Sequence, residues 1–136
     1  MDIRPVIDGF AAAPQLTLDE VADAAAQGYR TLICNRPDGE EPGQPSADEM
    51  RAMAEANGMT FHYLPVFPGS FPPALVTEMR DVMDGAEAPV LAYCRSGTRS
   101  TFLWGLSQAG LRPAPEILAA GASAGYDLRP IAPALG

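Results

Sequence analysis

Residues 90–100 read Val90-Leu91-Ala92-Tyr93-Cys94-Arg95-Ser96-Gly97-Thr98-Arg99-Ser100. The apolar run that ends at Tyr93 predicts a buried strand, and the apolar residues after Ser100 predict a helix. The loop between them holds a glycine, two arginines and three hydroxyl groups. Backbone N–H groups at the start of a helix converge and carry partial positive charge. We therefore interpret Cys94 as a nucleophile in an anion-binding loop, the cradle, where a cysteine is expected to be a thiolate near neutral pH.

The rest of the chain alternates predicted strands with predicted helices around this stretch. Capping boxes predict helices that begin at Thr17 and Ser46. Regular alternation of this kind predicts an α/β fold, with a mainly parallel central sheet flanked by helices on both faces. We expect a single domain that spans residues 1–136 and begins with a hairpin of two strands, Arg4–Ile7 and Phe10–Ala12. The tail from Gly125 to Gly136 is predicted to be extended, and the helix after the cradle to begin at Ser100.

Both cysteines lie at the carboxyl ends of predicted strands. Cys34 is the last residue of the strand Tyr29–Cys34, and Cys94 closes the strand described above. The carboxyl ends of parallel strands meet at one edge of a sheet, where ligands bind. Cys34 is thus a possible redox partner of Cys94, as a resolving thiol or a sulfur acceptor. The alternative is a buried structural cysteine, a common place for this residue.

Composition excludes several classes of function. The formal net charge is −8 and all nine basic residues are arginines, which argues against nucleic acid as a partner. No apolar run is long enough to span a bilayer, and the N-terminus does not resemble a signal peptide. With one histidine and two separated cysteines, we expect no metal site and no cofactor. A cytoplasmic location with free thiols is therefore predicted.

The chain resembles two families. Four residues separate Cys94 from Arg99, as in the active-site loop of rhodanese-type sulfurtransferases. The chain as a whole resembles the phosphatase-like domain of bacterial beta-lactamase-hydrolase-like proteins, a branch of the tyrosine and dual-specificity phosphatase fold. The second resemblance rests on Gly9-Phe10, the Asn35–Glu40 turn, Gln44-Pro45-Ser46, Tyr63–Val66 and the cradle. It implies a protein tyrosine phosphatase-like fold and a functional association with a persulfide-oxidising or beta-lactamase-like hydrolase.

Three departures from the phosphatase pattern favour sulfur transfer. That pattern places five residues between cysteine and arginine, which here would put the arginine at Ser100. The Val66–Pro72 loop contains no acid to protonate a leaving group, and Tyr93 stands where phosphatases usually carry histidine. Sulfite or a thiolate needs no such proton when it leaves. We therefore predict a sulfurtransferase that passes sulfane sulfur from thiosulfate or a persulfide, through a Cys94 persulfide, to a thiol acceptor.

Two alternatives remain open. The first is a phosphatase that acts on a phosphorylated substrate through a Cys94 phosphocysteine, and the second is a non-catalytic module that senses anions or sulfide. In each case Cys94 and Arg99 form the centre of the site. The remaining predicted substrate-binding residues are Arg95, Ser96, Gly97, Thr98, Ser100, Arg36 and Asp38. Asp38 is also the one candidate for a displaced general acid, with a turn salt bridge or helix cap as its alternative, and Glu40-Glu41 is predicted to be a solvated pair.

Overall fold

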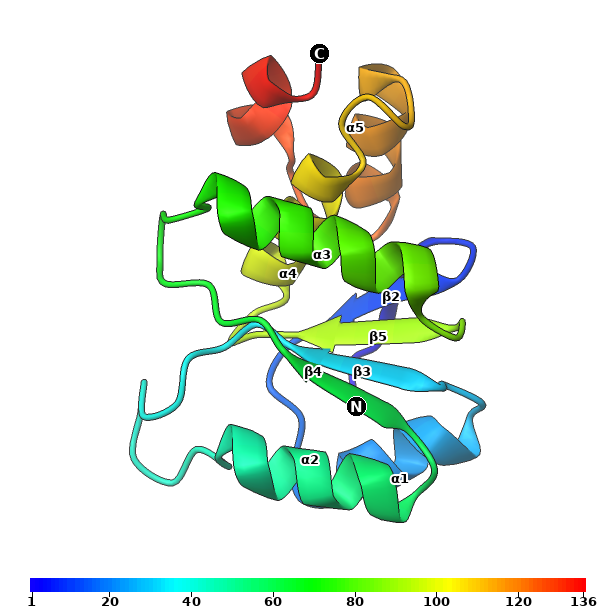
Figure 1. Ribbon diagram of the computed structural model, residues 1–136, viewed down its shortest axis with the longest axis vertical. Helices are drawn as coiled ribbons and strands as arrows, with labels where there is room; N and C mark the ends of the chain where they lie inside the picture. The colour runs from blue at the N-terminus through cyan, green and yellow to red at the C-terminus, as the bar shows by residue number, and fades with distance from the viewer.

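A five-stranded sheet forms the centre of the protein, shown in a computed structural model that describes residues 1–136 (Figure 1). The strand order is β1-β2-β5-β3-β4. β1 runs antiparallel to β2, and the other neighbouring pairs are parallel. The strands are β1 (Arg4–Ile7), β2 (Phe10–Ala13), β3 (Thr31–Cys34), β4 (Thr60–Tyr63) and β5 (Val90–Tyr93). The predicted α/β class is confirmed, and the strand that leads into the cradle is the central one.

Helices cover both faces of the sheet (Figure 1). On one face lie α1 (Leu18–Ala26) and α2 (Ala47–Ala56), and on the other α3 (Pro73–Gly85), α4 (Thr98–Ser107) and α5 (Ala114–Ser123). Both predicted capping boxes are present: Thr17 with Glu20 opens α1, and Ser46 with Glu49 opens α2. None of these helices is both long and apolar enough to cross a membrane.

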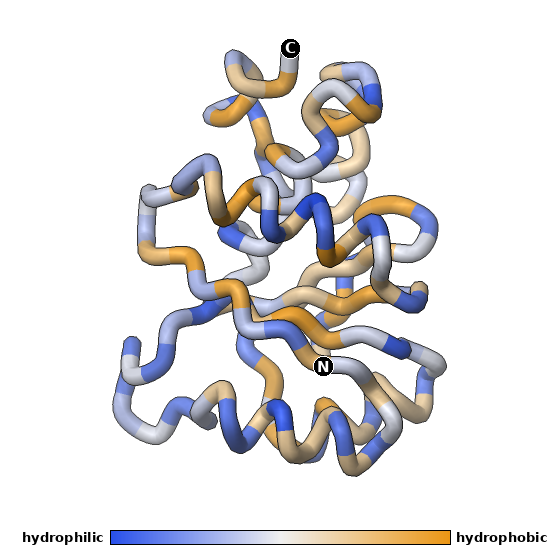
Figure 2. Tube along the Cα trace, viewed as in Figure 1, coloured by the Kyte–Doolittle hydropathy of each residue, from blue (hydrophilic) through white to orange (hydrophobic).

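Alternate residues of the strands build two separate cores. Val90 and Ala92 of β5 pack in the core that holds Trp104, while Leu91 and Tyr93 pack in the core beneath α1 and α2. Apolar residues follow the middle strands in Figure 2. Trp104 stacks on Phe10, with 5.5 Å between ring centroids, which fixes α4 against the sheet.

Two boundaries differ from the predictions. α4 begins at Thr98 rather than at Ser100, because Gly97 turns the chain into the helix with a φ of 94°. The tail is not extended: it forms a 3-10 helix, η1 (Arg129–Ala134), between Leu128 and Leu135, both of which are buried. Proline is compatible with the first positions of such a turn, and burial of the two leucines favours a compact tail.

The close packing of this tail gives a stability prediction. A Cβ added at Gly121 in α5 would lie 2.5 Å from Leu128 Cγ and 3.2 Å from the Tyr126 carbonyl oxygen. We expect Gly121→Ala to lower the free energy of unfolding by roughly 1–3 kcal/mol, as overpacking does. Urea denaturation measures the change.

Gly85→Ala is the matched control, because nothing lies within 4 Å of the added Cβ at the end of α3. Equal stability of the two variants would contradict the observed docking of the tail on α5.

Candidate active site

Cys94 lies at the end of β5, fully buried beneath the cradle. The Gly97 backbone N–H donates to Cys94 Sγ at 3.1 Å. The left-handed φ of Gly97 favours glycine, and it brings this N–H over the sulfur just before α4 starts. Together, the N–H group and the partial positive charge of the helix start make a local environment for an anionic sulfur or oxyanion.

Arg99 is fixed in the first turn of α4 by acceptor atoms of two residues. Its Nη1 donates to Glu40 Oε2 at 2.8 Å and to the Val66 carbonyl at 2.7 Å, and its Nη2 donates to Glu40 Oε1 at 2.7 Å. Glu40 thus binds the terminal edge of the guanidinium, and Arg99 Nε donates no hydrogen bond of its own to the protein. The hydrogen bonds with Glu40, and to a smaller extent the nearby Cys94 sulfur, raise the pKa of Arg99.

Glu40 also binds Arg36, whose side chain is only 1% exposed. Arg36 Nε donates to Glu40 Oε1 at 3.0 Å, and its two Nη atoms donate to Gln15 and Glu41 at 3.1 Å each. Glu40 and Glu41 are both exposed residues, as the prediction of a solvated pair expects, but their carboxylates also bind the buried Arg36 guanidinium. The hydrogen bond from Arg99, in particular, lowers the pKa of Glu40, so this carboxyl is an acceptor at neutral pH rather than a proton donor.

Asp38 has a structural partner of its own. Its Oδ1 accepts from the Ala47 backbone N–H at 2.8 Å, at the start of α2, and its own N–H donates to the Tyr63 hydroxyl at 3.0 Å. These contacts match the capping alternative. Asp38 and the buried Arg36 therefore support the loop after β3, and neither side chain hydrogen-bonds to a cradle residue around Cys94.

The other predicted substrate-binding residues lie together in the cradle because they are contiguous in the chain. Arg95 and Ser96 are exposed, and the Ser96 hydroxyl donates to Thr98 Oγ1 at 3.0 Å. Ser100 is buried, and its Oγ has no hydrogen-bond partner. A buried hydroxyl without a partner costs free energy. The Ser100 hydroxyl is therefore available to donate to a group bound in the cradle.

Cys34 lies beside the site but on another face of the sheet. It pairs in register with Tyr93 and shares the core beneath α1 and α2 with it. Cys94 is the next residue after Tyr93, so its side chain projects to the opposite side. Both thiols are free. Burial raises the pKa of Cys34 to about 11, so this sulfur is a protonated thiol at neutral pH, and it donates to the Arg36 carbonyl at 3.3 Å.

The sequence did not predict the roles of two residues that contact the site, Glu40 and Tyr126. Glu40 lies inside a turn that the family resemblance already marked, but its role depends on a fold that brings the loop after β3 next to α4. Tyr126 comes from beyond α5, and its hydroxyl donates to the Ser96 carbonyl at 3.1 Å. No local sequence signal marks this tyrosine, because the contact spans thirty positions of the chain.

Comparison with known proteins agrees with this architecture. The sequence profile of the phosphatase-like domain of beta-lactamase hydrolase-like proteins matches residues 2–111. A beta-lactamase hydrolase-like protein from Xylella fastidiosa (strain Temecula1) is 35% identical over 130 residues, which are 94% of this chain and 30% of that protein. This chain thus spans about a third of the length of the curated relatives it matches.

Solved structures give the same fold. A crystal structure of a phosphatase candidate from Neisseria meningitidis Z2491 is 37% identical, with a TM-score of 0.86 over 99% of this chain and 96% of that one. The structure of Tk-PTP in its active form is 17% identical, with a TM-score of 0.68 over 90% and 84% of the two chains, which shows a shared fold. These similarities favour the phosphatase alternative over the sulfur transfer that the sequence ranked first. The chain belongs to the family of phosphatase-like domains of beta-lactamase hydrolase-like proteins.

Proposed function

We propose that this domain hydrolyses phosphate monoesters through a phosphocysteine at Cys94. The observation that carries the proposal is the Gly97 N–H group on Cys94 Sγ, beside an arginine whose Nε donates no hydrogen bond to the protein. The Cys94 thiolate attacks phosphorus, a sulfur–phosphorus bond forms, and the bond to the leaving oxygen breaks. Water then attacks the phosphocysteine, which releases inorganic phosphate and returns the thiolate.

The cradle stabilises the negative charge of the transferred group in both steps. The loop N–H groups and the start of α4 point positive charge at this position, and the Nε edge of Arg99 has the geometry to hold two phosphoryl oxygens. The Ser100 hydroxyl, buried without a partner, is a further donor in this proposal. Exposed Arg95 supplies a second cation at the mouth of the site.

Glu40 acts on this reaction through Arg99. A flexible arginine loses rotamer entropy when it binds an anion, and a side chain already held by other contacts loses less. Glu40 and the Val66 carbonyl hold the guanidinium on one edge. Glu40 is thus a positioning residue, and Arg36 orients Glu40 in turn.

The site offers no evident proton donor for the leaving oxygen. Glu40, the carboxylate that hydrogen bonds bring to the cradle, is held ionised by Arg99. The Val66–Pro72 loop, whose first carbonyl Arg99 binds, contains no acid. A positioned general acid typically contributes 10²–10⁴-fold to such a reaction. The proposed substrates are therefore phosphates with weakly basic leaving groups.

Sulfur transfer is the second candidate, and one observation favours it. The Cys94–Arg99 spacing matches a sulfurtransferase loop, and sulfite leaves thiosulfate without a proton. In that reaction the Cys94 thiolate attacks the outer sulfur of thiosulfate, a persulfide forms and sulfite departs. Cyanide or a thiol then removes the sulfur.

Cys94→Ser separates these functions from simple anion binding. We expect the variant to lose hydrolysis of p-nitrophenyl phosphate by at least about a thousandfold, because the nucleophile is gone. Phosphate release and thiocyanate formation from thiosulfate plus cyanide are measured in parallel.

The matched control is Cys34→Ser, which we expect to remain within about threefold of the wild type, because Cys34 has no part in the proposed step. Cys94-dependent thiocyanate without phosphate release would replace the phosphatase proposal by sulfur transfer. Anion binding without either turnover would leave a binding module.

The leaving group gives a second prediction. Without a general acid, kcat/KM should depend steeply on the basicity of the leaving phenolate. We expect p-nitrophenyl phosphate to exceed phenyl phosphate by at least about a hundredfold, the low end of what a general acid supplies. Steady-state kinetics on both esters measure this ratio. Values within about tenfold of each other would reveal a proton donor and contradict this account of the site.

Glu40→Gln tests how Arg99 is held. A glutamine amide cannot accept both Nη groups, so we expect kcat/KM for p-nitrophenyl phosphate to fall about ten- to a hundredfold. Glu41→Gln is the control: it changes a half-exposed ligand of Arg36 that does not contact Arg99, and it should stay within about threefold. Equal losses in the two variants would show that the ion pair with Arg99 has no specific role.

A further inference from the structure

We propose that Tyr126 is a positioning residue, which polarises the Ser96–Gly97 peptide and so strengthens the N–H donor over Cys94. The inference rests on the proposed function only in that the cradle must stabilise an anionic sulfur and a bound oxyanion. The family profile ends at residue 111, so Tyr126 belongs to a part of the chain that the profile does not cover.

A single peptide group links Tyr126 to Cys94. The Tyr126 hydroxyl donates to the Ser96 carbonyl oxygen at 3.1 Å. The same peptide carries the Gly97 N–H, which donates to Cys94 Sγ at 3.1 Å. Hydrogen bonds in a chain polarise one another, so a peptide whose oxygen accepts a bond is a stronger donor through its N–H. The tyrosine thus acts on the sulfur without touching it.

The packing around Gly97 fixes this arrangement. A Cβ at Gly97 would overlap the Tyr126 hydroxyl, so the glycine is required both by its backbone angle and by the tyrosine behind it. The hydroxyl lies on the carbonyl side of the Ser96–Gly97 peptide, opposite the N–H that faces the sulfur. Tyr126 therefore supports the cradle from outside and does not occupy the place of a substrate.

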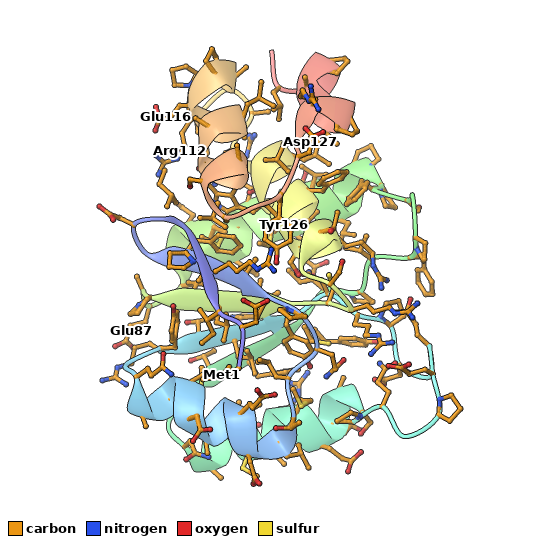
Figure 3. The ribbon with its side chains drawn as sticks, turned by 180° about the vertical axis from the view of Figure 1, so that it is seen from behind. Met1, Glu87, Arg112, Glu116, Tyr126 and Asp127 are labelled. Atoms are coloured by element: carbon orange, nitrogen blue, oxygen red, sulfur yellow. The ribbon has the colours of Figure 1, made fainter.

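Tyr126 itself is held on several sides. Its side chain is buried in the core that includes Trp104 and Leu128, and its backbone N–H donates to the Gly121 carbonyl at 2.9 Å. The Arg4 guanidinium lies 5.3 Å from the centre of its ring. Figure 3 shows Tyr126 on the stretch that follows α5, next to α4. Burial raises the pKa of this hydroxyl, so it remains a protonated donor at physiological pH.

Tyr126→Phe removes the donor and keeps the ring. We expect the pH midpoint of Cys94 alkylation by iodoacetamide to move upward. Peptide mass spectrometry measures the alkylation. We also expect affinity for vanadate, a phosphate analogue, to fall about three- to tenfold, the loss expected for one hydrogen bond. Tyr29→Phe is the matched control, because Tyr29 is half-buried and its hydroxyl makes no hydrogen bond in the structure; it should leave both values within about twofold of the wild type.

A merely structural role would change the melting temperature of Tyr126→Phe and leave the alkylation midpoint and vanadate affinity as in Tyr29→Phe; that result overturns the proposal. The Gly97 amide proton in NMR spectra is a second readout. It should shift upfield in Tyr126→Phe as its hydrogen bond weakens, and an unchanged resonance would also overturn the proposal. Alkylation needs no turnover. A failure of the phosphatase assays would therefore overturn the proposed function, while the alkylation and NMR measurements would still test the role of Tyr126.

Discussion

One carboxylate, that of Glu40, binds both an arginine of the cradle and a buried arginine of the loop after β3. Glu40 binds the terminal edge of Arg99 and the Nε of Arg36, which is almost completely buried. A buried guanidinium is stable only when its charge is paired and its N–H groups find acceptors. Glu40, Glu41 and Gln15 meet that requirement for Arg36. Glu40 Oε1 accepts from both Arg36 and Arg99, and Oε2 accepts a second bond from Arg99, so the same carboxylate fixes both guanidinium groups.

The chemistry of the site follows from this constraint. The overall charge of −8 would repel an anion, but the cradle presents backbone N–H groups, the start of α4 and the Nε of an arginine. These groups favour a bound oxyanion locally. The carboxylate that creates the arrangement is kept ionised by it, so it cannot also act as an acid. The single ion pair thus positions the arginine and also keeps Glu40 from acting as a proton donor.

Much of the fold could be predicted from local sequence signals. The capping boxes at Thr17 and Ser46, the hairpin around Asp8-Gly9, and the strand, loop and helix around Cys94 each depend on residues close together in the chain. Glu40, Tyr126 and the compact tail could not be found in this way. Their roles depend on contacts between distant segments: a loop after β3 with α4, and a residue beyond α5 with the cradle. Asp38 shows the reverse case, an acid in a promising loop that serves as a helix cap.

The spacing within the cradle and the similarity of the whole chain point to different chemistry. Four residues between Cys94 and Arg99 suggested sulfur transfer, whereas the family profile and the Neisseria meningitidis structure favour the phosphatase alternative. The physical question is whether this shorter loop, with Arg99 held by Glu40, still surrounds a tetrahedral anion.

A crystal structure of the Cys94→Ser variant with bound tungstate answers this question most directly. The account predicts tungstate above residue 94, with the Gly97 N–H and the Nε edge of Arg99 as donors while Glu40 keeps the terminal edge. An anion bound elsewhere, or an Arg99 side chain that leaves Glu40 to reach it, would contradict the account.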